Sequence, residues 1–189
     1  MSKRELKKQQ NRQQMIQAAI ELYSKKTFSE VSVRDIAKKA NVSPALLYQY
    51  FDDQQHLFLI AMQHENKKLL QELAQYTTID EVANGYITYF FEHEPLFQMM
   101  SHFMLQPKGD ESSQIFVEES SKLFQLFKEA LSNVASKEQL QVETQLLFST
   151  LNGLLITYKN LPQYSKEQSL AHILSLVERT LQKIPTKEA

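Results

Sequence analysis

The sequence predicts an all-α protein. Leu, Phe, Ile, Ala and Met supply most of the apolar residues, Gln, Lys and Glu supply most of the polar ones, and only 3 of the 189 residues are Gly. This composition favours helix. Apolar residues also recur at spacings of three and four along most of the chain, which is the period of an amphipathic helix. We therefore expect helices in every folded segment.

Composition also excludes several classes of protein. The chain has no Cys, so disulfides, thiolate metal sites and cysteine nucleophiles are excluded. The first 14 residues are charged and Gln-rich, unlike a signal peptide or a membrane anchor. The longest apolar stretch, 146–158, contains polar residues and is too short to span a bilayer. We expect a cytoplasmic protein with no membrane association.

Charge is unevenly distributed along the chain. Residues 1–50 contain ten Lys or Arg and four acidic residues, a net charge of +6, whereas residues 51–189 contain eleven and eighteen, a net charge of −7. The N-terminal part can therefore attract a polyanion, although a solvated charged tail is an alternative explanation. The polar first dozen residues are interpreted as a mobile arm.

Two helices are expected before residue 42. Apolar residues at i, i+3, i+4 and i+7 begin at Ile16 and predict a helix that ends near Lys25 and Lys26, where cations favour a helix C-terminus. Ser32 is then a suitable N-cap for a short second helix. That helix ends at Asn41, because Asn tolerates a left-handed backbone.

A third helix begins with strong sequence signals. Ser43 can cap it and Pro44 occupies its first position, and we expect it to continue through Phe51. Leu47 and Phe51 lie one turn apart and are expected to face the first two helices. The side chains expected to point outward are Pro44, Ala45, Tyr48 and Gln49.

A fourth helix, 54–74, has an apolar first half and a polar second half, as expected of a connector. Beyond residue 78 the chain becomes rich in aromatic residues and Met. Pro, Gly and Ser separate five further expected helices, at 80–93, 95–106, 113–134, 137–160 and 166–184.

The second and third helices, joined by a three-residue turn, form a helix-turn-helix unit, whose second helix enters the DNA major groove in known examples. The segments that carry a family resemblance are 16–23, 32–43 and 47–51. Together they resemble the N-terminal domain of the tetracycline-repressor (TetR/AcrR) family over roughly residues 14–60. The resemblance implies a cytoplasmic homodimeric transcriptional regulator that binds a double-stranded, palindromic DNA operator.

Three positions depart from the family pattern. Thr27 and Asn41 stand where the family usually has Gly, and Gln54 replaces a Lys that contacts a phosphate. Asn41 is a mild change, whereas Thr27 predicts a differently shaped end of the first helix. Gln54 can still donate a hydrogen bond but releases no counterion, so affinity is expected to depend more on the basic arm.

The resemblance also implies roles for individual residues. Those expected at phosphates are Ser32, Ser43, Tyr50 and Gln54, and those expected near base edges are Arg34, Pro44, Ala45, Tyr48 and Gln49. The chemistry of these side chains fits the implied roles, because hydroxyl groups bind phosphate oxygens, Arg pairs with guanine and Gln pairs with adenine. For Tyr48 and Tyr50, simple packing against neighbours is the alternative.

The C-terminal part contains more aromatic and Met side chains than a small bundle needs, which suits a cavity for varied apolar molecules. The resemblance implies an effector pocket there, and we expect a small apolar or amphipathic effector that releases a repressor from DNA. The candidate ligand-binding residues are Tyr89, Phe90, His93, His102, Phe103, Phe124, Phe148 and Asn152. For each of them a core or surface role is the alternative.

The resemblance further implies that the last two helices form the dimer interface. The candidate interface residues are Leu147, Leu151, Leu154, Leu170, Leu174 and Val177, and an intramolecular core would use the same residues. We place the arm and helix-turn-helix DNA-binding domain at 1–53, and the connecting helix with the helical effector-binding and dimerisation domain at 54–189.

No catalytic arrangement is recognisable. The His pairs 56/64 and 93/102 lack the spacing of a helical metal site, and no Gly-rich phosphate loop is present. We expect no enzyme activity, no metal and no cofactor. Two alternatives remain for the function: a DNA-binding regulator controlled by a protein partner or by no ligand, and an interaction module whose basic arm docks on acidic lipid or protein.

Overall fold

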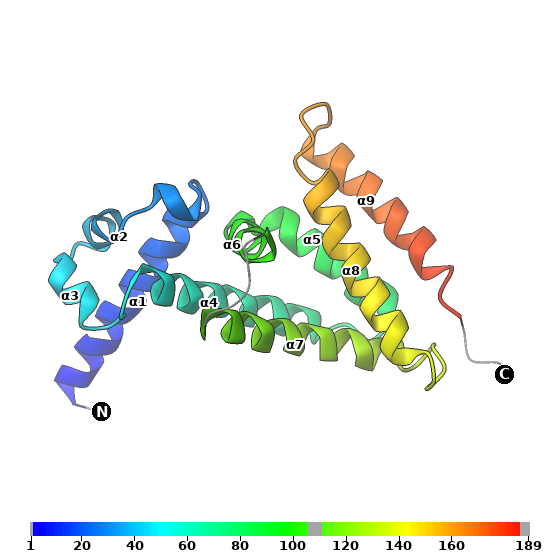
Figure 1. The fold of residues 1–189 in the computed structure, drawn as a ribbon, viewed down its shortest axis with the longest axis horizontal. Helices are drawn as coiled ribbons and strands as arrows, with labels where there is room; N and C mark the ends of the chain where they lie inside the picture. Colours follow the sequence, from blue (N-terminus) through cyan, green and yellow to red (C-terminus); the bar gives the residue numbers. More distant parts are fainter. Residues whose placement is uncertain (1, 106–110, 186–189) are drawn as a thin grey trace. The chain divides into compact units, whose positions relative to one another are not determined.

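The computed structural model in Figure 1 describes residues 2–105 and 111–185, except for the side chains of residues 103, 105, 111–113 and 116. Over these residues the chain is helical and contains no strand, which confirms the predicted all-α class. The helices are α1 (Lys3–Tyr23), the short 3₁₀ helix η1 (Phe28–Glu30), α2 (Val33–Lys39), α3 (Pro44–Tyr48), α4 (Gln54–Leu73), α5 (Ile79–Glu92), α6 (Glu94–Leu105), α7 (Glu111–Leu131), α8 (Leu140–Tyr158) and α9 (Lys166–Leu181). None of these helices is both long enough and apolar enough to cross a membrane.

The first dozen residues were predicted to form a mobile arm, and this prediction was wrong. They form the first turns of α1, which starts at Lys3. The Ser2 hydroxyl accepts a hydrogen bond from the Glu5 backbone N–H, and the Glu5 carboxylate accepts one from the Ser2 N–H at 2.6 Å. This capping box satisfies two otherwise unpaired N–H groups at the helix start. Polar composition alone does not reveal such a cap.

The end of α1 also departs from the family pattern, as Thr27 predicted. The helix stops at Tyr23, and Thr27 has an extended backbone with φ −68° rather than a left-handed one. Its N–H and hydroxyl donate to the Glu30 carboxylate, and η1 follows. A β-branched residue thus avoids the strained left-handed region by starting a new helical turn.

The chain divides into two compact units. The first comprises residues 1–66 and 94–117, and the second comprises 67–93 and 118–189. This division does not follow the predicted boundary at residue 53, because the first part of α4 and all of α6 belong to the first unit. Residues of α4 therefore belong to both units.

Buried apolar side chains define the core of each unit. In the first unit α1 packs against α2 and α6, and α2 packs against α3. The core side chains of α1 to α4 include Ile16, Ile20, Tyr23, Ile36, Leu47, Phe51, Leu57 and Phe58. In the second unit α5, α8 and α9 pack against one another, and their core includes Tyr86, Phe90, Phe127, Leu151, Leu155, Ile173 and Val177.

Candidate DNA-binding surface and second-unit grooves

The turn between α2 and α3 is closed by the backbone of Asn41. Asn41 has φ 55°, and it is the one non-Gly residue with positive φ in the described part of the chain. Its N–H donates to the Lys38 carbonyl at 3.2 Å, and the Val42 N–H donates to the Ala37 carbonyl at 2.9 Å. These two bonds form a Schellman motif, the usual way to end a helix on a left-handed residue. The turn predicted from Asn41 is therefore the turn observed.

The start of α3 also follows the sequence. The Ser43 hydroxyl accepts from the Leu46 backbone N–H at 3.1 Å, and Pro44 is the first residue of the helix. α3 ends at Tyr48, earlier than the predicted Phe51, although the backbone N–H groups of residues 49–51 still bond to carbonyls of Leu46 and Leu47. Helix boundaries of this kind shift by one or two residues because terminal turns are partly 3₁₀.

One face of α3 is buried and the other is exposed. Leu47 and Phe51 are fully buried against the core, as predicted. The exposed side chains are Pro44, Ala45, Tyr48 and Gln49. Tyr48 is 54% exposed, so packing against neighbours, the alternative considered for it, does not describe this residue. A large aromatic side chain left in solvent is available to a partner.

At the start of α2, Ser32 and Asp35 cap each other. The Ser32 hydroxyl accepts from the Asp35 N–H and donates to the Asp35 carboxylate, which also accepts from the Ser32 N–H at 2.9 Å. These hydrogen bonds lower the pKa of Asp35 because they favour its charged form. Ser32 and Arg34 are both exposed, on the same first turn of α2.

Gln54 has a role that the sequence did not predict. Its side-chain Nε2 donates to the Phe28 carbonyl at 3.1 Å and to the Val31 carbonyl at 2.5 Å. Both amide hydrogens are therefore used inside the protein, and neither is left for the phosphate contact expected from the family pattern. Gln54 instead holds the start of α4 to the η1 segment.

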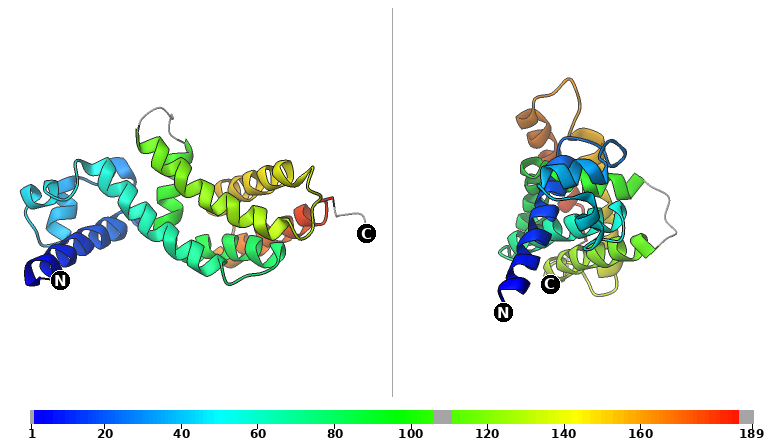
Figure 2. Two further views of the ribbon diagram at one scale, coloured as in Figure 1. Left: turned by 90° about the horizontal axis from the view of Figure 1, so that it is seen from below. Right: turned by 90° about the vertical axis from the view of Figure 1, so that its left-hand side faces the viewer.

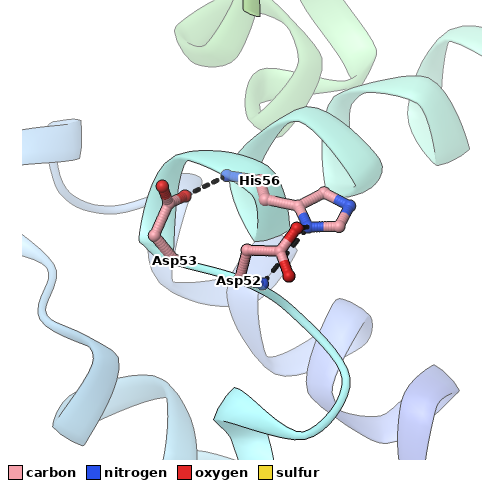
Figure 3. Close-up of polar contacts among 3 residues, drawn as sticks. All are labelled: Asp52, Asp53 and His56. Carbon is pink, nitrogen blue, oxygen red and sulfur yellow. Dashed lines mark hydrogen bonds and ion pairs between the residues drawn. The ribbon is translucent and has the colours of Figure 1, made fainter.

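Acidic residues lie next to Gln54, at the beginning of α4 (Figure 3). The Asp53 carboxylate accepts from the His56 backbone N–H at 2.7 Å and so caps the helix. The Asp52 carboxylate lies 3.1 Å from His56 Nδ1, and its side chain is 93% exposed. Carboxylates stabilise a helix N-terminus but repel phosphates. Sequence analysis did not identify this cap, although Asp before a helix is a recognisable signal.

Tyr50 is half-buried and its ring centre lies 6.5 Å from that of Phe51. It is therefore the least accessible of the residues expected at phosphates, apart from Gln54. Ser32 and Ser43 remain accessible at the starts of two neighbouring helices, where backbone N–H groups also favour anions. The first unit thus presents hydroxyl groups, helix starts and Arg34 beside the exposed face of α3.

In the second unit, four of the eight predicted ligand-binding residues lie in an aromatic cluster around Tyr86: Phe90, Phe124, Phe148 and Asn152. The Tyr86 hydroxyl donates to the Asn152 side-chain oxygen at 2.7 Å, and the Asn152 amide donates to the Phe148 carbonyl at 2.8 Å. The rings that surround Tyr86 or Phe148, with centres 4.9–6.3 Å apart, belong to Phe90, Phe124 and Phe127. Burial raises the pKa of Tyr86. This arrangement matches the core role that we considered as the alternative.

Tyr89 and His93 lie elsewhere, at a groove between α4 and α5 with a volume of about 650 Å³. Their rings are stacked, with centres 3.7 Å apart. The groove is otherwise polar, and its acidic lining residues are Glu72, Asp80, Glu81 and Glu92.

A second groove, of about 830 Å³, lies between α4 and α7. Its apolar lining residues are Leu70, Leu73, Ala74, Val82, Leu126 and Ala130, and its polar rim includes Lys122, Glu129 and Asn133. This groove could not be predicted from the sequence, because its lining residues come from α4, α5 and α7, whose packing the sequence does not reveal.

The two predicted ligand residues on α6 belong to the first unit. His102 stacks on Phe28 of η1 at 4.9 Å between ring centres and meets the Phe58 ring at 5.3 Å. The side chain of Phe103 lies outside the described residues. His102 therefore belongs to a different unit from Tyr89, Phe90 and Asn152, because α6 packs on α1.

The predicted dimer residues lie mostly inside the second unit. Leu147, Leu151 and Val177 are at most 1% exposed, and they form the intramolecular core that we considered as the alternative. The half-buried residues of the set are Leu154, Leu170 and Leu174. The solvent-facing side of α8 instead exposes Val142, Leu146 and Ile156, at 54%, 57% and 39%. Apolar residues recur at helical spacing on both the buried and the solvent-facing side of α8, so the sequence alone could not show which side belongs to the core.

Comparisons with known proteins agree with this description. Residues 15–60 match the model of the bacterial regulatory proteins of the tetR family. The HTH-type transcriptional regulator BetI of Brucella anthropi is 41% identical over 64 residues, which are 34% of this chain and 31% of that protein. The chain thus aligns with about a third of the length of that relative.

Solved structures extend the likeness of the fold to nearly the whole chain. A tetR-family transcriptional regulator from Streptomyces coelicolor superposes with a TM-score of 0.72 at 17% identity, over 94% of this chain and 90% of that one. The transcriptional regulator FadR from Bacillus subtilis, in complex with stearoyl-CoA, gives 0.71 at 18% identity, over 91% and 98%. Residues 15–60 are thus similar to the helix-turn-helix segment of the tetR-family regulators, and the chain as a whole shares the all-α fold of the solved structures.

Proposed function

We propose that this regulator is a homodimeric repressor that binds a palindromic operator and leaves it when a small amphipathic ligand binds the second unit. The observation that carries the proposal is the exposed face of α3. Tyr48 and Gln49 point into solvent while Leu47 and Phe51 anchor the same helix in the core. A recognition helix needs one face that is buried in the core and an opposite polar face that is exposed for contact with DNA.

The exposed residues divide into two groups by chemistry. Arg34 and Gln49 carry side chains that pair with guanine and adenine in the major groove, and Pro44 and Ala45 offer small apolar surfaces to thymine methyl groups. Ser32, Ser43 and Tyr50 carry hydroxyl groups for phosphate oxygens. Tyr48 contributes a large exposed ring to the same face. Gln54 takes no part in DNA binding in this proposal.

A second copy of the chain is proposed to dock on the solvent-facing side of α8. Val142, Leu146 and Ile156 form an apolar stripe there, with the exposed Ser149 and Gly153 between them. A Cβ at Gly153 would meet no atom within 4 Å, so the backbone at this point is open to close approach. Leu154 on α8, and Leu170 and Leu174 on α9, are half-buried. Two-fold pairing would place two recognition helices about 34–36 Å apart, one helical turn of DNA.

The effector is proposed to occupy the groove between α4 and α7. Its apolar floor suits a hydrocarbon portion, and Lys122, Glu129 and Asn133 at its rim suit a polar group. The FadR neighbour holds stearoyl-CoA, a ligand of this amphipathic kind. The groove at Tyr89 and His93 lies in the same unit and is the alternative site for such a ligand.

The helix α4 is proposed to connect ligand binding to DNA release. Its residues up to Asn66 belong to the first unit and those from Lys67 onward to the second, and Leu70 lines the groove beside the fully buried Leu69. A ligand shifts the equilibrium only by binding the released conformation more tightly. Coupling of about 1–3 kcal/mol is the expected range.

The experiment begins with duplexes that the purified protein enriches from a random-sequence library. Enriched duplexes should share a palindromic motif, and their affinity should exceed that of unrelated DNA by about 10³-fold or more at fixed salt. Equal affinity for all duplexes, falling steeply with salt, would indicate polyanion attraction alone and contradict operator binding.

Amphipathic and apolar compounds are then titrated into the protein–operator complex, while thermal stability and DNA release are followed in parallel. A compound that stabilises the free protein and releases DNA supports the switch. Compounds that stabilise the protein yet never weaken DNA binding would favour a regulator controlled by a protein partner or by no ligand.

A further inference from the structure

The first part of α1, residues Lys3–Arg12, is the most basic segment of the chain, and we call it the basic extension. Five of its ten residues are cationic and one, Glu5, is acidic. The cationic residues are Lys3, Arg4, Lys7, Lys8 and Arg12. Glu5 is used in the capping box with Ser2, so the extension carries a concentrated positive charge on a regular helix.

The basic extension does not contribute to the core of the first unit. Residues 3–10 are all exposed, including Leu6 at 47%, and burial in α1 begins at Met15. A helix of this length without tertiary packing is only marginally stable on its own in water. The capping box and its continuity with the packed part of α1 hold it in helical form, and its exposed charges remain available to a partner.

All the cations of the extension lie on one half of the helix. At about 100° per residue, Arg4, Lys8 and Arg12 form one row, and Lys3 and Lys7 lie beside it. Gln13 points the opposite way, and its side-chain nitrogen lies 3.1 Å from His64 Nε2 on α4. The basic half of the helix is therefore the side opposite Gln13.

Arg12 fixes the direction of the basic row relative to α3. Its guanidinium lies 5.6 Å from the centre of the Phe51 ring, just beyond the end of α3. The row continues inward to Ile16, which is buried in the same unit, and outward to Lys8 and Arg4. In Figures 1 and 2 the first turns of α1 project past α3. Lys3 lies about 14 Å along the helix axis from Arg12.

We propose that the basic extension is a second DNA contact, which binds the phosphate backbone of the duplex flanking each half-site, outside the base pairs read by α3. The occupant is duplex DNA because the row is continuous with the recognition surface of the same unit and has the complementary charge. Each neutralised phosphate releases counterions and adds affinity without sequence preference. This inference rests on the proposed operator binding and adds a contact that the helix-turn-helix does not contain.

The test is a variant that carries Lys3→Gln, Arg4→Gln, Lys7→Gln and Lys8→Gln. Ser2, Glu5 and Arg12 are kept, so the cap and the contact with Phe51 are unchanged, and Gln preserves helix propensity. Affinity is measured by fluorescence anisotropy on two duplexes that contain the same enriched operator. One duplex has flanks of about ten base pairs on each side, and the other ends at the outer edge of each half-site.

On the flanked duplex the variant should bind about 10-fold or more weakly. The slope of log affinity against log salt should become shallower by about 4–7, since each of the two protomers loses four cations and each phosphate contact contributes about 0.9. On the short duplex wild type and variant should differ little, because the flanking phosphates are absent. The matched control carries Lys137→Gln, Lys166→Gln, Arg179→Gln and Lys183→Gln, four exposed positions of the second unit, and should bind both duplexes like wild type.

Two outcomes would overturn the inference. An equal loss on both duplexes would mean that the extension acts through general charge or on the operator itself, and no loss on either would mean that it does not contact DNA. Failure of the wild-type protein to enrich any duplex would contradict the proposed operator binding, and it is visible before any variant is compared.

Discussion

The residues of the proposed DNA-binding surface differ in what holds their side chains. The hydroxyl groups of Ser32 and Ser43 accept hydrogen bonds from backbone N–H groups as helix caps. The side chains of Arg34, Tyr48 and Gln49 instead extend from exposed positions of α2 and α3. Capped hydroxyl groups have a fixed direction, which suits contacts that set register on the backbone. Longer exposed side chains can adapt to base edges, which suits sequence readout.

The first prediction separates these two roles. Gln49→Ala or Arg34→Ala should change which duplexes are preferred and cost about 1–3 kcal/mol on the enriched operator, because a base-specific hydrogen bond is lost. Tyr50→Phe should weaken all duplexes alike, because it removes only a hydroxyl group for phosphate. Competition binding on an operator library measures both effects, with Gln17→Ala, an exposed position of α1, as the control. Unchanged preference in both Ala variants would remove Arg34 and Gln49 from base readout.

The second prediction concerns Gln54. Gln54→Ala removes two hydrogen bonds to the carbonyls of Phe28 and Val31, and leaving such acceptors unsatisfied costs about 1–3 kcal/mol. The free energy of unfolding in urea should fall by this amount, while affinity for the enriched operator should not change. Gln71→Ala, an exposed position of the same helix, should leave stability unchanged. Weaker operator binding by Gln54→Ala, measured where the variant is fully folded, would support the phosphate contact expected from the family pattern.

At the scale of helices, local signals predicted the elements and missed their pairing. Ser32, Asn41, Ser43 and Pro44 act through neighbours in sequence, so the helix-turn-helix was predictable from the chain alone. The basic extension was missed because its cap depends on Ser2 and Glu5 within a segment with no apolar period. The place of α6 in the first unit depends on packing against α1, far apart in sequence, and no local pattern indicates it.

The same reasoning explains the mixed outcome for the ligand and dimer residues. An apolar side chain at helical spacing, such as Phe90 or Leu151, is compatible with a core, a pocket or an interface. Only the tertiary arrangement assigns Phe90 to the cluster around Tyr86 and Leu151 to the core. The exposed residues suggest other candidates: Leu146 on α8 for the dimer interface, and Ala130 on α7 for the ligand-binding groove.

The third prediction concerns the contact between α6 and η1. His102 stacks on Phe28 and meets Phe58, and burial lowers the pKa of His102. The unfolded chain therefore takes up a proton near pH 6.5, before the folded protein does. Stability should be fully present above that pH and should fall as the pH decreases through it.

Replacing His102 with Phe keeps an aromatic ring against Phe28 and removes the titrating group. The loss of melting temperature between about pH 7.5 and about pH 5.5 should therefore be smaller in His102→Phe than in wild type. Differential scanning calorimetry at both pH values measures this difference, and the other histidines contribute equally to the two proteins. An equal loss in both proteins would show that His102 does not contribute to the pH dependence.

At the scale of the whole molecule, the proposed recognition of an operator requires the pairing of two copies of the chain. One helix-turn-helix contacts too few base pairs to select an operator, and a two-fold pair doubles the site and fixes its spacing. The solvent-facing side of α8 offers apolar side chains beside an open backbone at Gly153. Exposed apolar stripes of this kind mark interaction surfaces, and burying them in a dimer removes the cost of leaving them in water.

The last prediction tests this pairing with Leu146→Glu and Ile156→Glu combined. Both side chains are exposed in the single chain, at 57% and 39%, so the variant should keep its helix content and fold. Placing four unpaired carboxylates in the interface of a dimer should be strongly unfavourable, and analytical ultracentrifugation should show monomers. Operator affinity should fall when dimerisation is lost, because each monomer retains only one recognition helix.

The control is Val117→Glu, at a position 54% exposed in the first unit, and this variant should remain dimeric. Leu151→Glu would not distinguish the models, because it places a charge in the core of the protomer and should unfold it. A dimer that persists in the double variant would show that the two copies meet on another surface.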